Sequence, residues 1–201
     1  MIPPGLSGRD DLLQRRAESW CPPIFRPNRT AWDAIRSAVR RQFDLQAASI
    51  WYDLKVLLAS CDGTVLDVGC GAQPYRPLIP PAARYTGIDT ADAEARFGYR
   101  VPDTIYFAGD RWPVDSASIS TVIATETIEH VENVDRFLAE ARRVLRPDGR
   151  LILTVPFSAR WHYIPHDYWR FTPSGLKTIL TRAGFDTPAV YARGNEITVA
   201  C

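Results

Sequence analysis

The chain has 201 residues, and its 24 lysines and arginines nearly balance its 23 aspartates and glutamates, for a formal net charge of +1. This length suits one domain around a single core, and the near-neutral charge argues against nucleic acid or a charged membrane surface as a partner. No apolar run approaches the roughly 18 residues that a membrane-spanning helix needs.

The cysteines and the N-terminus narrow the class further. The cysteines show neither a CxxC pair nor the dense spacing of a disulfide framework; they are Cys21, Cys61, Cys70 and Cys201. Residues 1–16 mix prolines with charges where a signal peptide needs an apolar segment. We therefore expect reduced thiols, no structural zinc and a cytoplasmic protein.

The first 60 residues predict an irregular arm followed by two helices. Prolines and charges without periodicity fill residues 1–29. Thr30 is a suitable N-cap for a helix over 30–43, in which apolar residues recur at helical spacing, and 44–60 reads as a second amphipathic helix. The apolar residues of the first helix are Trp32, Ile35, Val39 and Phe43. Such a pair either forms a lid over a ligand site or simply caps a sheet, and the sequence leaves both open.

From residue 61 to 201, short apolar runs alternate with helical or loop segments, which predicts a Rossmann-like α/β core: a mostly parallel sheet with helices on both faces. Strands are expected near 64–69, 84–89, 104–109, 119–125, 150–156 and 188–194. A helix is expected over 134–145, because Pro147 and Gly149 prevent it from continuing. A second is expected over 172–184, with Thr172 as its cap. Because the chain stops without a closing turn, we expect the sheet to be truncated at its C-terminal strand and the natural polypeptide to continue past Cys201.

The strongest motif is the run VLDVGCG at 65–71, a buried strand that ends in a carboxylate and two glycines. Glycine allows a sharp turn at the carboxyl end of a strand and a close approach of ligand to main chain. A dinucleotide fingerprint would need a third glycine at position 74, where this chain has Pro74. A nucleotide ligand is therefore favoured, and a diphosphate disfavoured.

Two further carboxylates follow strands at suitable intervals. Asp89 ends the run YTGID about 20 positions after the glycines, where an acidic residue accepts the ribose hydroxyls of an adenosine. Asp110, in the run GDRWP, stands where a carboxylate could meet an adenine amino group beside an apolar neighbour. Taken alone, Asp89 could equally be a helix cap or a solvated strand end, and Asp110 would more often be a turn residue.

These ordered motifs resemble those of the class I S-adenosylmethionine-dependent methyltransferases, especially the ubiquinone and menaquinone methyltransferase subgroup, over residues 62 to 185. The resemblance implies S-adenosyl-L-methionine as cofactor and methyl transfer as activity. It implies a methionine-end contact from the loop holding Asp67, Gly69, Cys70 and Gly71; ribose contacts from Asp89 and Thr90; adenine contacts from Asp110, Arg111 and Trp112; and an approach to the sulfonium from Thr125 and Glu126. The chain departs from the family pattern at Gln73 and Pro74, which bears on the shape of the first loop.

The segment Glu126 to His130 has two interpretations. Quinone O-methyltransferases carry a similar E-x-x-E-H as a divalent-metal site, with Glu126, Glu129 and His130 as the ligands here, although this set suits Mg²⁺ or Mn²⁺ only moderately. In many relatives with I-E-H-V, the histidine packs beside the cofactor or helps to bind the acceptor. We expect no metal.

The acceptor is expected to face residues 160–172, a stretch dense in histidine, arginine and aromatic residues after the fifth strand. For a hydroxyl acceptor, a neutral imidazole is the natural general base. His166 is the first candidate, with His162 and His130 next. In the structural alternative, Trp169 and Phe171 are core residues and Arg170 pairs with Asp167.

The sequence thus predicts methylation of a small molecule, with O-methylation in secondary-metabolite or glycan metabolism as the first hypothesis. It predicts no nucleic-acid or membrane partner and leaves a homodimer open. Two alternatives remain: a non-catalytic binding module on the same fold, and an NAD-dependent oxidoreductase, against which Pro74 argues.

Overall fold

The computed structural model describes residues 24, 26–28, 30–159, 162 and 166–193. Five strands form one parallel sheet in the order β3-β2-β1-β4-β5. They are β1 (Gly63–Val68), β2 (Ala83–Thr90), β3 (Thr104–Phe107), β4 (Ile119–Thr125) and β5 (Leu145–Thr154). The predicted Rossmann-like sheet is confirmed.

Helices surround this sheet, and local sequence signals account for their starts. They are α2 (Ala31–Phe43), α3 (Leu45–Leu58), α4 (Ala93–Phe97), α5 (Val134–Val144) and α6 (Pro173–Arg182), with 3-10 turns η1 (Arg76–Leu78) and η2 (Ile128–His130). The side chains of Asp44, Asn133 and Thr172 each accept a backbone N–H from the first turn of the helix that follows. None of the described helices has the length and apolarity to cross a bilayer.

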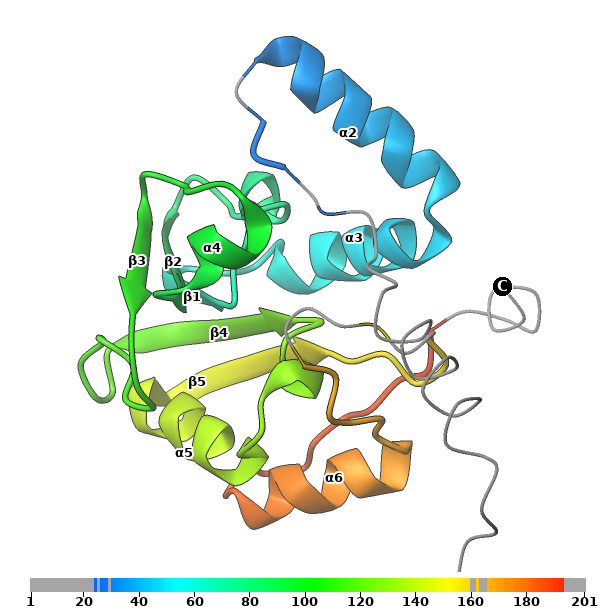
Figure 1. Ribbon diagram of the computed structural model, residues 1–201. Helices are drawn as coiled ribbons and strands as arrows, with labels where there is room; N and C mark the ends of the chain where they lie inside the picture. Colours follow the sequence, from blue (N-terminus) through cyan, green and yellow to red (C-terminus); the bar gives the residue numbers. More distant parts are fainter. Residues whose placement is uncertain (1–23, 25, 29, 160–161, 163–165, 194–201) are drawn as a thin grey trace, which may run out of the picture.

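The two faces of the sheet bury different residues of the same strands. Leu66, Val68 and Ile88 pack with α5 and α6, whereas Val65 and Ile123 pack with α3. Figure 1 shows α3 along one side of the sheet, and α5 and α6 along the other. Since side chains alternate along a strand, Asp67 and Asp89 project from the α3 face.

Three predictions about the fold need correction. No strand forms over 188–193, the described part of the expected sixth strand. The fifth strand begins at Leu145, directly after α5, because Leu145 pairs with Ile119 and the residues up to Arg150 bulge out of the ladder. The third strand ends at Phe107. The end of the chain beyond 193 lies outside the described residues.

The apolar stripe of α2 is not buried as an amphipathic helix would predict. Trp32, Ile35, Val39 and Phe43 are between 52% and 84% exposed. Because α3 already covers this face of the sheet, α2 packs on α3 in a further layer and has no second surface to bury against among the described residues (Figure 1). The division of the chain at residue 60 stays a prediction, since α3 contributes its own residues to the core.

The strand order reverses between β1 and β4. The chain runs outward from β1 through β2 to β3, then returns to β4 on the other side of β1. In open α/β sheets, ligands bind where the order reverses in this way, beyond the carboxyl ends of the strands. Both the glycine motif and Glu126 follow the strands at this point.

Candidate functional site

The glycine motif forms the tight turn that its sequence predicts. Gly69 and Gly71 both have positive φ, 69° and 49°, in the region that side chains other than glycine rarely adopt. A Cβ at Gly69 would also lie 2.6 Å from Cγ2 of Thr127. The turn is tied to the next strand by bonds from the amides of Gly69 and Cys70 to the carbonyl of Ile88, at 3.0 and 3.2 Å.

Asp89 joins β2 to this turn. Its Oδ2 accepts the amide of Gly71 at 2.8 Å, and its Oδ1 accepts the amide of Thr90 at 2.7 Å. Burial raises the pKa of the carboxyl, and the two amide bonds oppose that shift. The predicted acidic residue and the predicted glycine loop are therefore neighbours.

Asp67 is a buried carboxyl beside Asp89. It is 1% exposed; one oxygen, Oδ2, accepts the Tyr85 hydroxyl at 2.7 Å, and the other, Oδ1, has no partner among the described residues. Burial, reinforced by the charge of Asp89 and opposed by the bond from Tyr85, raises the pKa of Asp67 to about 7. An unpaired, buried oxygen is costly, so this side chain is suited to a cationic partner.

Gln73 explains how the loop forms despite its departure from the family pattern. The residue has φ of 57° and a side chain only 6% exposed. Its Nε2 donates to Thr104 Oγ1 at 2.9 Å, and its Oε1 accepts Arg76 Nη1 at 2.9 Å. The glutamine thus fixes the loop against β3. Together with Tyr85, it is a contributor that the motif alone did not reveal.

The three residues expected at the adenine lie in different environments. Asp110 is exposed and pairs with Arg136 at 2.6 Å, at the start of α5. Arg111 is exposed. Trp112 is 4% exposed and meets Phe137 edge to face in the core, with ring centroids 5.1 Å apart. Its ring is therefore committed to packing, whereas the adenine contact of the two charged residues stays a prediction.

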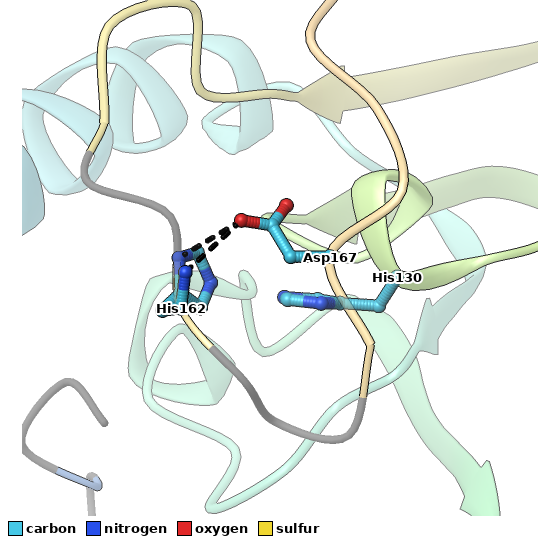
Figure 2. A group of neighbouring side chains, drawn as sticks. All are labelled: His130, His162 and Asp167. Atoms are coloured by element: carbon cyan, nitrogen blue, oxygen red, sulfur yellow. Dashed lines mark hydrogen bonds and ion pairs between the residues drawn. The ribbon is translucent and has the colours of Figure 1, made fainter. Parts of the chain in front are cut away.

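Histidines from two distant segments meet beyond the end of β4 (Figure 2). His130 ends η2, and His162 belongs to the segment after β5; their ring centroids are 5.1 Å apart. His162 Nδ1 lies 3.4 Å from Oδ2 of Asp167. His130 Nδ1 lies 2.5 Å from the carbonyl oxygen of His166, and burial lowers the pKa of His130.

His166, by contrast, is exposed, and its ring lies beside that of Tyr168 with centroids 5.3 Å apart. The residues around it follow part of the structural alternative. Arg170 donates to Asp167 from both of its terminal nitrogens, Nη1 and Nη2. Phe171 packs on the core, and the indole of Trp169 donates to the carbonyl of Val131 at 2.8 Å. His162 is therefore the better oriented imidazole.

The described residues offer a poor metal site. Ligand atoms of His130, His162 and Asp167 lie within 4.8 Å of one another, but both oxygens of Asp167 already accept from Arg170. The guanidinium neutralises the charge that a metal ion would need. Glu126, Glu129 and His130 do not gather to ligand distance in the described part of the chain.

Glu129 is a buried acid beneath these histidines. It is 1% exposed; Oε1 lies 3.7 Å from Nε2 of His130, and Oε2 has no partner among the described residues. Burial, with a contribution from the charge of Glu126, raises its pKa to about 9. The carboxyl is therefore neutral near pH 7.

We expect Glu129→Gln to flatten the pH dependence of stability. Because the folded state holds this proton more tightly than the unfolded chain, stability falls as pH rises from the ordinary glutamate pKa of 4.5 towards 9. A glutamine has no such titration, so at pH 8.5 we expect the variant to melt about 2–4 °C higher than the unsubstituted protein.

Thermal melts from pH 5 to 9 test this expectation, with the exposed Glu132→Gln as the matched control. Parallel curves for the unsubstituted protein and Glu129→Gln would contradict it.

Comparison with known proteins agrees with this geometry. A family model described as a methyltransferase domain matches residues 66–153. A ubiquinone biosynthesis O-methyltransferase of Bradyrhizobium diazoefficiens is 28% identical over 153 residues, covering 69% of this chain and 57% of that protein. A protein encoded in a transposon of Streptomyces fradiae is 31% identical over 115 residues, covering 52% of this chain and 32% of its own.

The fold also matches a solved structure. It is that of a Haloferax volcanii complex between the Trm112 methyltransferase activator and a methyltransferase, with a TM-score of 0.54, 23% identity and 74% of each chain covered. Residues 66–153 carry a methyltransferase domain, and the relatives identify it as one of the class I S-adenosylmethionine-dependent type. The chain spans less than two thirds of the two curated relatives above.

The cofactor of this family is S-adenosyl-L-methionine, and the site fits it. The unpaired Oδ1 of Asp67 is the kind of acceptor that an ammonium group requires. At Gly71 a Cβ would meet only the hydroxyl of Tyr99, at 3.5 Å, so the main chain there is open to a ligand. Asp89 lies one strand away, where adenosine ribose is bound in such sheets. The assignment of individual contacts belongs to the proposal below.

Proposed function

We propose that this methyltransferase transfers a methyl group from S-adenosyl-L-methionine to a hydroxyl of a small molecule. The observation that carries the proposal is the junction of Asp67, Gly71 and Asp89 at the carboxyl ends of β1 and β2, with a buried carboxylate oxygen left for a cation. Nothing in this junction provides the extended glycine path that a pyrophosphate uses.

In the proposed arrangement the three carboxylates have separate tasks. Asp67 and the turn at Gly69, Cys70 and Gly71 bind the methionine end. Asp89, with Thr90 beside it, accepts the ribose hydroxyls, and Asp110 with Arg111 borders the adenine. When bound, the cofactor supplies a sulfonium-activated methyl group, so the protein's own task is chiefly to align the acceptor and to exclude water.

His162 is the proposed general base. Asp167, fixed by Arg170, lies next to Nδ1 of His162 and would hold a proton there, which leaves Nε2 to accept the proton of the acceptor hydroxyl. His130, whose ring lies edge to face with that of His162, limits how the base can turn. This order of candidates differs from the sequence-based one because Asp167 lies 3.4 Å from Nδ1 of His162, whereas the ring of His166 is exposed beside Tyr168.

The acceptor class is supported by the relatives and not by contacts. A relative named as a ubiquinone biosynthesis O-methyltransferase favours an oxygen acceptor, which agrees with the imidazole beside the site. We retain secondary-metabolite or glycan metabolism as the setting and the cytoplasm as the location.

The decisive experiment is a calorimetric titration of the purified protein with S-adenosylhomocysteine and, in parallel, with NAD. We expect micromolar binding of S-adenosylhomocysteine, on the order of −8 kcal/mol, and no heat with NAD. Binding of NAD alone would favour the oxidoreductase alternative. Binding of S-adenosylhomocysteine without methyl transfer to a panel of phenols and hydroxylated sugars would favour the non-catalytic module.

A further inference from the structure

Glu126, at the end of β4, is held by three different parts of the fold. Its Oε1 accepts the Thr154 hydroxyl of β5 at 2.8 Å, and its Oε2 accepts Nε2 of Gln46 on α3 at 2.5 Å. Nη2 of Arg193, in the segment after α6, lies 3.4 Å from Oε1. Both carboxylate oxygens are therefore occupied by protein donors.

Arg193 carries the connection back to α3. Its Nε lies 3.8 Å from Oδ2 of Asp53, and Asp53 stands seven residues, or about two turns, after Gln46 on the same helix. Glu126 and Arg193 thus hold α3 at two points along one face. Apart from its apolar packing on the sheet, this polar link joins the helix to the tips of β4 and β5.

The backbone at Glu126 is strained in a way that supports a specific role. Its φ of 48° is unusual for a residue with a side chain. The conformation is held by its own amide, which donates to the carbonyl and the hydroxyl of Thr154, at 3.0 and 3.2 Å. Strain of this kind persists only where surrounding contacts over-determine it, and it concentrates at functional sites.

The helix held by Glu126 stands over the loop that follows the glycine turn. A cavity of about 420 Å³ lies between them. It is lined by Ala47 and Trp51 of α3 and by Ala72, Gln73 and Tyr75 of the loop, together with residues 26–28 and Ser37 of α2. Ala72 follows Gly71 directly. The buried phenol of Tyr75 lies close enough to Glu126 and Asp67 for both charges to raise its pKa, in addition to the effect of burial. The contacts of Glu126 and the site around Asp67 are therefore parts of one region.

We propose that Glu126 is a positioning residue that latches α3 over the methionine end of the cofactor site. In this assignment α3 is the lid, and Gln46 and Arg193 are the residues that bind the Glu126 carboxylate and keep the lid closed. The cavity beside Ala72 is the space that the closed lid encloses. The inference rests on the proposed function for the ligand's identity. It gives Glu126 a role through α3, in addition to the approach to the sulfonium that the family resemblance implied.

The test combines hydrogen exchange with ligand dissociation on the full chain. Amide exchange is measured for residues 45–58 in the unsubstituted protein, Glu126→Ala, Glu126→Gln and the control Glu94→Gln, whose glutamate is exposed and pairs only with Arg100 in the described contacts. Dissociation of S-adenosylhomocysteine is then measured by stopped flow for the same proteins.

For Glu126→Ala we expect exchange in 45–58 to rise about tenfold while β4 and α5 keep their protection, and S-adenosylhomocysteine to leave about tenfold faster. Glu126→Gln should fall between. Its amide can still bond Thr154, and Gln46 once the Gln46 amide flips, but it lacks the charge that attracts Arg193. A general loss of packing would instead raise exchange everywhere and would not be rescued by glutamine.

The proposal is overturned if exchange in 45–58 or the rate of ligand release in Glu126→Ala matches that of Glu94→Gln. Should Glu126→Ala not fold, Gln46→Ala removes the hydrogen bond from α3 to Glu126. This variant must then raise both the exchange in 45–58 and the rate of ligand release. If the unsubstituted protein binds no S-adenosylhomocysteine, the proposed function fails, while the exchange measurement still decides whether Glu126 holds α3.

Discussion

Replacing Asp89 by alanine is expected to weaken the binding of S-adenosylhomocysteine by about 100-fold or more. In the proposed site the carboxylate accepts both ribose hydroxyls, and hydrogen bonds to a charged group contribute about 1.5–3 kcal/mol each. The same side chain holds the amide of Gly71 at 2.8 Å, so its loss also frees the turn that contacts the methionine end. Calorimetric titration at pH 7.5 measures the effect.

Asp92→Ala is the matched control. Asp92 follows the same strand, is exposed and pairs with Arg96, so its removal should change the affinity less than twofold. A melting temperature measured for each variant separates lost contacts from lost folding. Equal affinities for Asp89→Ala and Asp92→Ala would remove Asp89 from the cofactor site and, with it, the observation on which the methyl-transfer proposal depends.

Replacing His162 by alanine is expected to lower kcat about 10²- to 10⁴-fold, the usual contribution of a positioned general base. The affinity for S-adenosylhomocysteine should stay within twofold, because the imidazole is assigned to the acceptor. Turnover is measured by transfer of labelled methyl to an acceptor found in the phenol and sugar panel. Added imidazole should restore part of the activity of His162→Ala, an effect that a merely structural histidine would not show.

His166→Ala separates the two imidazoles. It should reduce kcat less than threefold, since the His166 ring is exposed and its carbonyl, which the substitution keeps, bonds His130. The reverse ranking would return the role of base to His166.

Excess chelator should leave the activity of the unsubstituted enzyme unchanged. Inhibition that added metal reverses would show that Arg170 does not keep a metal ion from Asp167.

The sequence anticipated the local geometry of the candidate site better than its long-range contacts. The turn at Gly69 and Gly71 and its neighbour Asp89 could be predicted because they depend on residue type and spacing: positive φ favours glycine, and consecutive parallel strands bring their carboxyl ends to one edge. The position of Trp112 could not be predicted. The sequence around a tryptophan next to an expected adenine loop is the same whether its ring faces the ligand or, as here, Phe137 in the core.

Elements that depend on a neighbour were also misjudged. The stripe from Trp32 to Phe43 has helical spacing, and α2 is a helix, but nothing in that spacing says that α3 already covers the sheet. Likewise, residues 188–193 have the composition of a strand without forming one. Propensity describes a segment alone, whereas strand pairing and burial need a partner that lies elsewhere in the chain.

The sequence by itself determined the family resemblance, the parallel sheet and the edge proposed for the ligand, since these follow from local patterns repeated along the chain. Only the tertiary structure decided that Glu126 is tied to Gln46 of α3 and to Arg193 in the segment after α6. The physical reason is that the hydrogen-bonding capacity of a carboxylate is finite. Which donors use it depends on residues brought together from distant parts of the chain, and no spacing within a motif records them.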